Sequence, residues 1–138
     1  MNSFSIPSTC NVHVIEKVLD TKEYSEYIRL GTIYAGATVS PTDDIYELCR
    51  SIKNRYDQEF PDNRWERLFN CSWERDDLRA IPQVGLVLIY SWGHGRSVKI
   101  MGQEVVTPHN SILCMLGEWV RMVDLPLNSN SFIIRYYD

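Results

Sequence analysis

The stretch 84–92, with the sequence VGLVLIYSW, constrains the fold more than any other part of the chain. A strand with one solvent-exposed face alternates apolar and polar residues, whereas this stretch is apolar at both sets of alternating positions. The pattern therefore predicts a strand that is buried on both faces. Such a strand lies in the centre of a sheet, so other strands must flank it.

Several other segments have strand-like patterns. Residues 11–19 alternate apolar and polar side chains, and a turn at TKEY (21–24) separates them from a second predicted strand at 26–35. Three further strands are predicted after the central one, at RSVKIM (96–101), EVVT (104–107) and SFIIRYY (131–137).

Residues 40–60 carry the clearest local signal in the chain, that of an amphipathic helix. Ser40 is a natural N-cap, because its hydroxyl can accept a hydrogen bond from an amide of the first turn. Pro41 suits the first helical position, and Asp43 completes a capping box. The apolar side chains recur at helical spacing and end before Pro61; they are Ile45, Leu48, Cys49, Ile52 and Tyr56.

Two more segments predict helices. Residues 62–79 begin at a cap residue and form one helix, or two short helices that separate at Cys71–Ser72. Residues 111–123, with the sequence SILCMLGEWVRMV, place their apolar side chains at helical spacing, and a strand is the alternative there.

Together these elements predict the fold class. We expect an α+β protein with a single domain, in which a mixed or antiparallel sheet packs against two to four helices. Residues 1–10 are expected to be a flexible segment, and residues 11–138 to form the globular domain. A length of 138 residues fits one domain with its own core. The sequence shows neither a secretory signal nor a membrane-spanning run, so we expect a cytoplasmic protein.

The loop YSWGHGR (90–96) holds a histidine between two glycines, which raises the question of a reactive site. Glycines on both sides of His94 suit a tight hairpin turn, because glycine adopts positive φ at little cost. No acidic residue stands beside His94 to orient it as a base. We therefore predict a turn and a non-catalytic protein. The enzymatic alternative is a small hydrolase that uses His94 or His109 with an acid such as Glu104.

The cysteines and histidines give no pattern of a metal site. The residues that could ligate a metal are Cys10, His13, His94, His109 and Cys114. Structural zinc sites use two closely spaced pairs of ligands, which this set lacks. We predict no metal and no cofactor, and we expect the four cysteines to be reduced thiols.

Four arginines lie in the predicted helix at 62–79, namely Arg64, Arg67, Arg75 and Arg79. Together with the neighbouring tryptophans they could bind the phosphates and stack on the bases of RNA, or contact a membrane surface. Acidic side chains among them cancel their charge, and the whole chain carries a net charge of −4. RNA binding is therefore an alternative and not the first prediction.

Large aromatic side chains are abundant, with four Trp and eight Tyr in the chain. Tryptophan, tyrosine and arginine are the residue types that anchor protein interfaces. The candidate anchors are Trp65, Trp73, Trp92, Trp119, Tyr136 and Tyr137. We therefore predict a protein that self-associates or binds a protein partner.

The order of the elements also resembles a known family. The stretch RLGTIYAGATVSPTDDIYELCRSIKNRY (29–56), a second predicted helix and the strand GLVLIYSW (85–92) are similar to the globular core of rhabdovirus matrix proteins. In that family a strand leads into a capped helix, a second helix follows, and a sheet completes the core. The resemblance spans residues 26–106. It implies a self-associating viral structural protein in the host cytoplasm or the virion.

Overall fold

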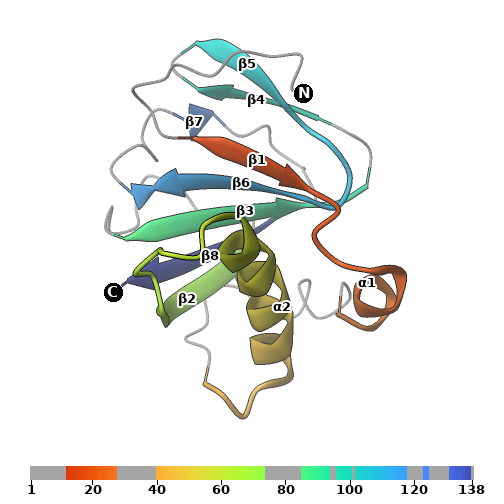
Figure 1. Cartoon of the computed structure of the whole chain (residues 1–138). Coiled ribbons are helices and arrows are strands. Elements are labelled where there is room, and N and C mark those ends of the chain that lie inside the picture. The colour runs from red at the N-terminus through yellow and green to blue at the C-terminus, as the bar shows by residue number, and fades with distance from the viewer. Residues whose placement is uncertain are drawn as a thin grey trace.

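The computed structural model describes residues 12–27, 40–73, 85–93, 96–100, 102–117, 123–124 and 131–137. These residues form two helices and eight strands (Figure 1). The helices are α1 (Thr21–Tyr27) and α2 (Asp44–Glu59). The strands are β1 (His13–Glu16), β2 (Arg67–Trp73), β3 (Leu86–Ser91), β4 (Arg96–Ile100), β5 (Gln103–Thr107), β6 (Ser111–Leu116), β7 (Val123–Asp124) and β8 (Ser131–Tyr137).

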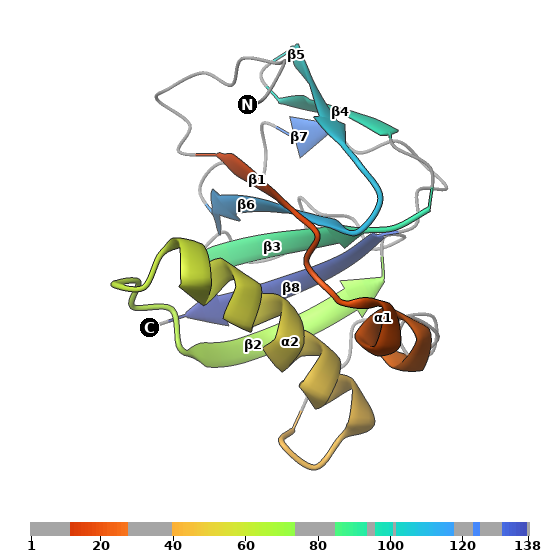
Figure 2. The same ribbon diagram turned by 45° about the vertical axis from the view of Figure 1, so that its right-hand side comes forward.

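The described elements stack in three layers. A five-stranded antiparallel sheet, in the order β1-β6-β3-β8-β2, forms the middle layer. Helix α2 lies across one face of this sheet, and a three-stranded antiparallel sheet, in the order β5-β4-β7, lies over the other face (Figures 1 and 2). β3 is the central strand of the middle layer, which confirms the prediction made from residues 84–92.

Alternating side chains of the middle sheet build two separate cores. On β3, Leu86, Leu88 and Tyr90 point to α2, whereas Val87 and Ile89 pack against the three-stranded sheet. Burial of these apolar surfaces on both faces is the main stabilising term of the fold. The core under α2 also contains Ile45, Leu48, Ile52, Ile112, Phe132 and Ile134. The second core also contains Val98, Ile100, Val105, Leu113, Met115 and Ile133.

Helix α2 confirms the helix that the sequence predicts, although it begins later. The predicted apolar face is buried, together with Lys53. The N-cap is Asp43 and not Ser40, because residues 41–43 form a turn in place of the first helical turn. In this turn the Asp43 carboxylate accepts hydrogen bonds from the Ser40 amide (2.9 Å) and the Ser40 hydroxyl (3.3 Å). Neither α1 nor α2 is long and apolar enough to span a bilayer.

The prediction of an α+β fold with two to four helices is wrong, because antiparallel sheet dominates the described structure. The segments 62–79 and 111–123, predicted as helices, contain the strands β2 and β6. The turn predicted at TKEY belongs to α1, a helix of seven residues that also takes Glu26 and Tyr27 from the predicted strand at 26–35. The rest of that strand and the N-terminal segment 1–10 lie outside the described residues.

Strand β2 explains why helical spacing misleads at 62–79. Leu68 and Cys71 are three residues apart, so a regular strand would place them on opposite faces. The pairing of β2 with β8 shifts between Leu68 and Asn70, which inserts an extra residue into β2 as a β-bulge. Because of the bulge, Leu68 and Cys71 both pack into the core under α2.

Strand β6 is apolar on both faces, which also mimics a helix. Ile112 and Cys114 belong to the core under α2, whereas Leu113 and Met115 belong to the second core. A continuous apolar run does not distinguish a buried strand from a buried helix. Pairing with β1 on one side and β3 on the other selects the strand.

The chain passes four times between the two sheets, and two of these connections, from β3 to β4 and from β5 to β6, meet at the same end of the sheets through His109. Gly93 has a φ of +91°, which confirms the positive φ predicted for this turn. The prediction of a hairpin is wrong, because β3 and β4 belong to different sheets. The Gly93 amide donates a hydrogen bond to Nδ1 of His109 (2.9 Å) and so ties the two connections together.

Candidate functional site

Two arginine side chains stack on aromatic rings where β2 begins and β8 ends. The Arg67 guanidinium carbon lies 4.3 Å from the ring centroid of Tyr137, and the strand register pairs these two residues. The Arg64 guanidinium carbon lies 4.7 Å from the ring centroid of Trp65. Both arginines are exposed, and both rings are half-buried. We call Arg64, Trp65, Arg67 and Tyr137 the arginine–aromatic surface.

A polar cluster fixes the segment that leads from α2 into this surface. The Asn63 side-chain amide donates to the Asp57 carboxylate (2.8 Å), and its carbonyl accepts from the Trp65 amide (3.0 Å). The buried Lys53 ammonium donates to both Asp57 and Asn63 and lies 5.3 Å from the ring centroid of Tyr136. These contacts hold the backbone at Trp65, and therefore help to position the arginine–aromatic surface.

The charges at the arginine–aromatic surface are balanced. Asp62 and Glu66 are exposed and alternate along the chain with Arg64 and Arg67. Proteins that bind nucleic acids present a net positive patch to the phosphates. The Trp65 ring is also covered by other groups of the protein, since it packs against the core under α2 and lies beneath the Arg64 guanidinium. Little of this ring is left for a nucleotide base to stack on.

Two of the aromatic residues predicted as anchors lie in the core. Trp92 is 8% exposed and Tyr136 is 4% exposed, and both pack under α2. The Tyr136 hydroxyl donates a hydrogen bond to the Cys49 carbonyl (3.1 Å), which satisfies its polar atom inside the core. Trp73 ends β2. Trp119, Arg75 and Arg79 lie outside the described residues.

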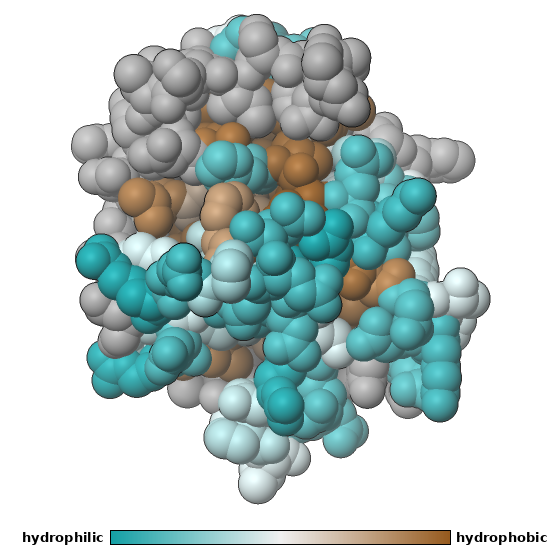
Figure 3. Space-filling view, viewed as in Figure 1, coloured by the Kyte–Doolittle hydropathy of each residue, from teal (hydrophilic) through white to brown (hydrophobic). Residues whose placement is uncertain are grey.

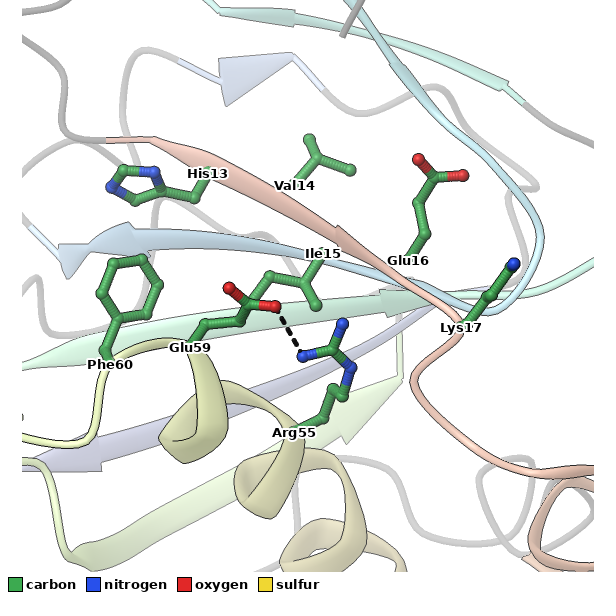
Figure 4. A pocket seen from close by; sticks show the side chains of 8 residues that line it. All are labelled: His13, Val14, Ile15, Glu16, Lys17, Arg55, Glu59 and Phe60. Carbon is green, nitrogen blue, oxygen red and sulfur yellow. Dashed lines mark hydrogen bonds and ion pairs between the residues drawn. The ribbon is translucent and has the colours of Figure 1, made fainter. Parts of the chain in front are cut away.

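A hollow of about 390 Å³ runs along the edge strand β1 (Figure 4). The five consecutive residues 13–17 line it, so it follows the backbone edge of the strand and not one of its faces. Its other wall comes from the end of α2, where Arg55 donates to the Glu59 carboxylate (2.8 Å). The Phe60 ring, next to Glu59, lies 4.9 Å from the imidazole of His13. We call this hollow the edge groove.

The edge groove continues into an apolar hollow of about 240 Å³, which shares His13 and Phe60 with it. This second hollow is lined further by Tyr56, Leu86, Cys114, Met115 and Leu116. The space-filling view shows hydrophobic side chains at the surface near β1, beside the hydrophilic side chains of α2 (Figure 3). An edge strand next to an open hollow can pair with an extended peptide through main-chain hydrogen bonds.

His109 has a structural role in the described part of the chain. Its Nδ1 accepts the hydrogen bond from Gly93, and its ring lies 5.0 Å from that of Tyr24. A catalytic histidine needs an acid that orients the ring from the side opposite the substrate. In His109 the backbone amide of Gly93, and not an acid, is hydrogen-bonded to Nδ1 of the ring. His94, the other histidine of the hydrolase alternative, lies outside the described residues.

The acids that could assist His109, Glu104 and Asp20, are hydrogen-bonded to other groups. Glu104, the acid that the sequence suggests as its partner, accepts a hydrogen bond from the Ser97 hydroxyl across the β4–β5 hairpin (2.8 Å). Asp20 shares a hollow of about 190 Å³ with His109, but its carboxylate accepts from the Glu23 amide (2.8 Å) and so caps α1.

The described residues contain no group of three or more His, Cys, Asp or Glu side chains that could hold a metal. His13 lies exposed at the edge groove, and Cys114 is buried in β6. Burial raises the pKa of the Cys114 thiol, which disfavours the thiolate that metals bind. Cys10 and His94 lie outside the described residues.

Comparison of the chain with protein-family models, with curated proteins and with solved structures gives no match. The resemblance to rhabdovirus matrix proteins therefore stays a prediction from the sequence.

Proposed function

We propose that the chain is a non-catalytic protein that self-associates through the open edge of β2 and the arginine–aromatic surface beside it. The observation that carries the proposal is the meeting of four interface-type side chains where β2 begins and β8 ends. In this role the chain would act as a viral structural protein of the matrix type, as its sequence resemblance implies.

β2 can extend the middle sheet from one copy of the chain to a second. Within the described residues β2 pairs with β8 alone, so half of its amides and carbonyls face away from the sheet. Antiparallel pairing with β2 of a second copy would satisfy these groups about a two-fold axis. Arg67 is the one charged residue of β2, so the strand carries little charge that would oppose this pairing.

The arginine–aromatic surface supports a protein partner over RNA. Asp62 and Glu66 offset the charge of Arg64 and Arg67, which removes the positive field that phosphates require. A guanidinium that is already stacked on a ring loses less side-chain entropy when it meets a partner. RNA binding through the same arginines is the alternative, and it predicts salt-sensitive retention of RNA.

Reversal of the charge at Arg67 tests the proposal. In the variant Arg67→Glu the cation over the Tyr137 ring is lost, and the arginine–aromatic surface no longer offers a stacked guanidinium to the second copy. We expect the dimer dissociation constant to rise by about tenfold or more. Sedimentation velocity over a concentration series of the full chain measures this constant.

Lys99→Glu is the matched control, because Lys99 is exposed on β4 in the other sheet and the change in charge is the same. This variant is expected to self-associate like the unmodified chain. Equal weakening in both variants contradicts a specific role of the β2 edge. An unmodified chain that sediments as a monomer throughout the series contradicts self-association itself.

A second candidate function is the binding of an extended peptide in the edge groove. The observation that favours it is that residues 13–17 line one hollow along the backbone edge of β1. Within the described residues β1 pairs with β6 alone, so its other edge can add a strand. The apolar hollow beyond His13 and Phe60 would accept one apolar side chain of such a peptide.

The variant Val14→Lys tests this second function. Val14 is half-buried at the edge groove, and the longer side chain of a lysine there would fill the groove beside the strand edge. Peptides selected by display on the full chain are expected to bind this variant about tenfold more weakly. Val106→Lys is the control, since Val106 is exposed on β5 in the other sheet. Equal binding to both variants contradicts peptide binding at β1.

A further inference from the structure

Strand β1 presents different side chains to the two faces of the middle sheet, and the edge groove runs past all of them. The His13 ring lies 4.9 Å from the ring of Phe60 just after α2, and Ile15 packs in the core under α2. Val14 packs on the other face, against the second core. Because side chains alternate along a strand, Glu16 lies on the same face as Val14. A strand that pairs with β1 therefore meets these side chains in a fixed order.

The end of the edge groove at His13 is apolar. The hollow of about 240 Å³ that opens there is lined by Tyr56, Leu86 and Cys114, which belong to the core under α2. Residues directly opposite each other on paired strands have their side chains on the same face of the sheet. A residue placed opposite His13 therefore directs its side chain toward this hollow, which has room for a leucine.

The other end of the edge groove carries two exposed charges of opposite sign, Glu16 and Lys17 (Figure 4). Neither residue takes part in an ion pair with another of the described residues. In the opposite wall Arg55 and Glu59 already pair with each other (2.8 Å). Opposite charges across two paired strands attract each other, whereas like charges repel. Glu16 and Lys17 are thus the charges of the groove that can select a partner.

We propose that the edge groove binds an extended peptide antiparallel to β1, whose residues are an acid, a base, two further residues and a large apolar residue, in that order. In this register the acid lies beside Lys17, the base lies opposite Glu16, and the apolar side chain enters the hollow next to His13. Every strand pair of the middle sheet is antiparallel, which is also the more stable form of pairing. The inference rests on the second candidate function, peptide binding at β1, and names its partner.

Fluorescence anisotropy of labelled synthetic peptides with the full chain tests this order of residues. The reference peptide has the core Glu-Lys-Thr-Val-Leu, flanked by threonines, and its charge-reversed form has the core Lys-Glu-Thr-Val-Leu. We expect the reference peptide to bind about tenfold more tightly, because two attractive pairs replace two repulsive ones. Alanine in place of the final leucine should also weaken binding by about tenfold, because the apolar hollow is left unfilled.

The double variant Glu16→Lys with Lys17→Glu is the matched control. Both residues are exposed and the net charge of the chain does not change, so the variant should fold like the unmodified chain. It should reverse the preference and bind the charge-reversed peptide about tenfold more tightly than the reference peptide. Such a reversal assigns the selectivity to these two side chains.

Equal binding of the two peptides to the unmodified chain would overturn the inference, and peptide binding at β1 would still stand if Val14→Lys weakens both. Equally tight binding of the core Leu-Val-Thr-Lys-Glu would also overturn it, since that order fits a parallel strand. Peptide binding that Val14→Lys does not weaken lies elsewhere and contradicts the second candidate function as well. Loss of self-association in Val14→Lys would show that a second copy of the chain, and not a peptide, pairs with β1.

Discussion

Replacement of Gly85 by alanine is expected to lower the free energy of unfolding by about 4 kcal/mol or more, which is a large fraction of the stability of an ordinary domain. Gly85 has a φ of +77°, which L-residues rarely adopt. A Cβ atom at this position would lie 2.0 Å from the carbonyl oxygen of Tyr136. That oxygen belongs to the backbone of β8, which pairs with both β3 and β2, so it cannot move aside as a flexible side chain could.

Gly102→Ala is the control for this prediction. Gly102 has nearly the same φ, +78°, but no atom lies within 4 Å of the position that its Cβ would take. The substitution should therefore cost only the backbone strain, about 1 kcal/mol. Urea denaturation followed by circular dichroism measures both variants. Similar losses in the two variants would mean that the close approach of Gly85 to β8 does not limit stability.

Asn110→Ala is expected to lower the free energy of unfolding by about 3 kcal/mol. The Asn110 carbonyl oxygen accepts hydrogen bonds from the Leu19 amide (3.0 Å) and the Tyr90 hydroxyl (2.7 Å), and its amide donates to the Leu19 carbonyl (2.8 Å). Burial raises the pKa of Tyr90, so its hydroxyl keeps its proton and remains a donor. Alanine would leave these polar groups without partners in a partly buried site.

Asn110→Gly separates the loss of the side-chain hydrogen bonds from the backbone strain that alanine has at positive φ. Asn110 has a φ of +61°, which glycine adopts without strain but alanine does not. The glycine variant should therefore be about 1 kcal/mol more stable than the alanine variant, and still well below the unmodified chain. Urea denaturation of both variants gives the difference. Unchanged stability in Asn110→Gly would show that the hydrogen bonds of the side chain contribute little.

The parts of the fold that the sequence predicts correctly are those with a strong local signal. Helix α2 has one apolar face of regular spacing, and β3 is apolar on both faces and short. The β4–β5 hairpin turns at Gly102, between the strands predicted at 96–101 and 104–107. Helix α1 has a signal that the prediction of a turn at TKEY overlooks, since Asp20 and Glu23 exchange hydrogen bonds as a capping box.

The parts that sequence patterns miss depend on contacts between distant segments. A bulge in β2 imitates helical spacing, and burial of β6 on both sides removes the alternation that would reveal a strand. The arginine–aromatic surface depends on the register that pairs Arg67 with Tyr137, which neither local sequence encodes. The edge groove depends on the order of the strands, which leaves β1 at one edge of the sheet and α2 beside it.

Amide hydrogen exchange at low and at high protein concentration tests the central claim, self-association through the β2 edge, most directly. If two copies pair there, exchange of the outward-facing amides within Arg67–Trp73 slows as the concentration rises, because these amides gain hydrogen-bond partners. Exchange in β5, an edge strand of the other sheet, should stay the same. Exchange rates in β2 that are independent of concentration, while the chain sediments as a dimer, would contradict the account.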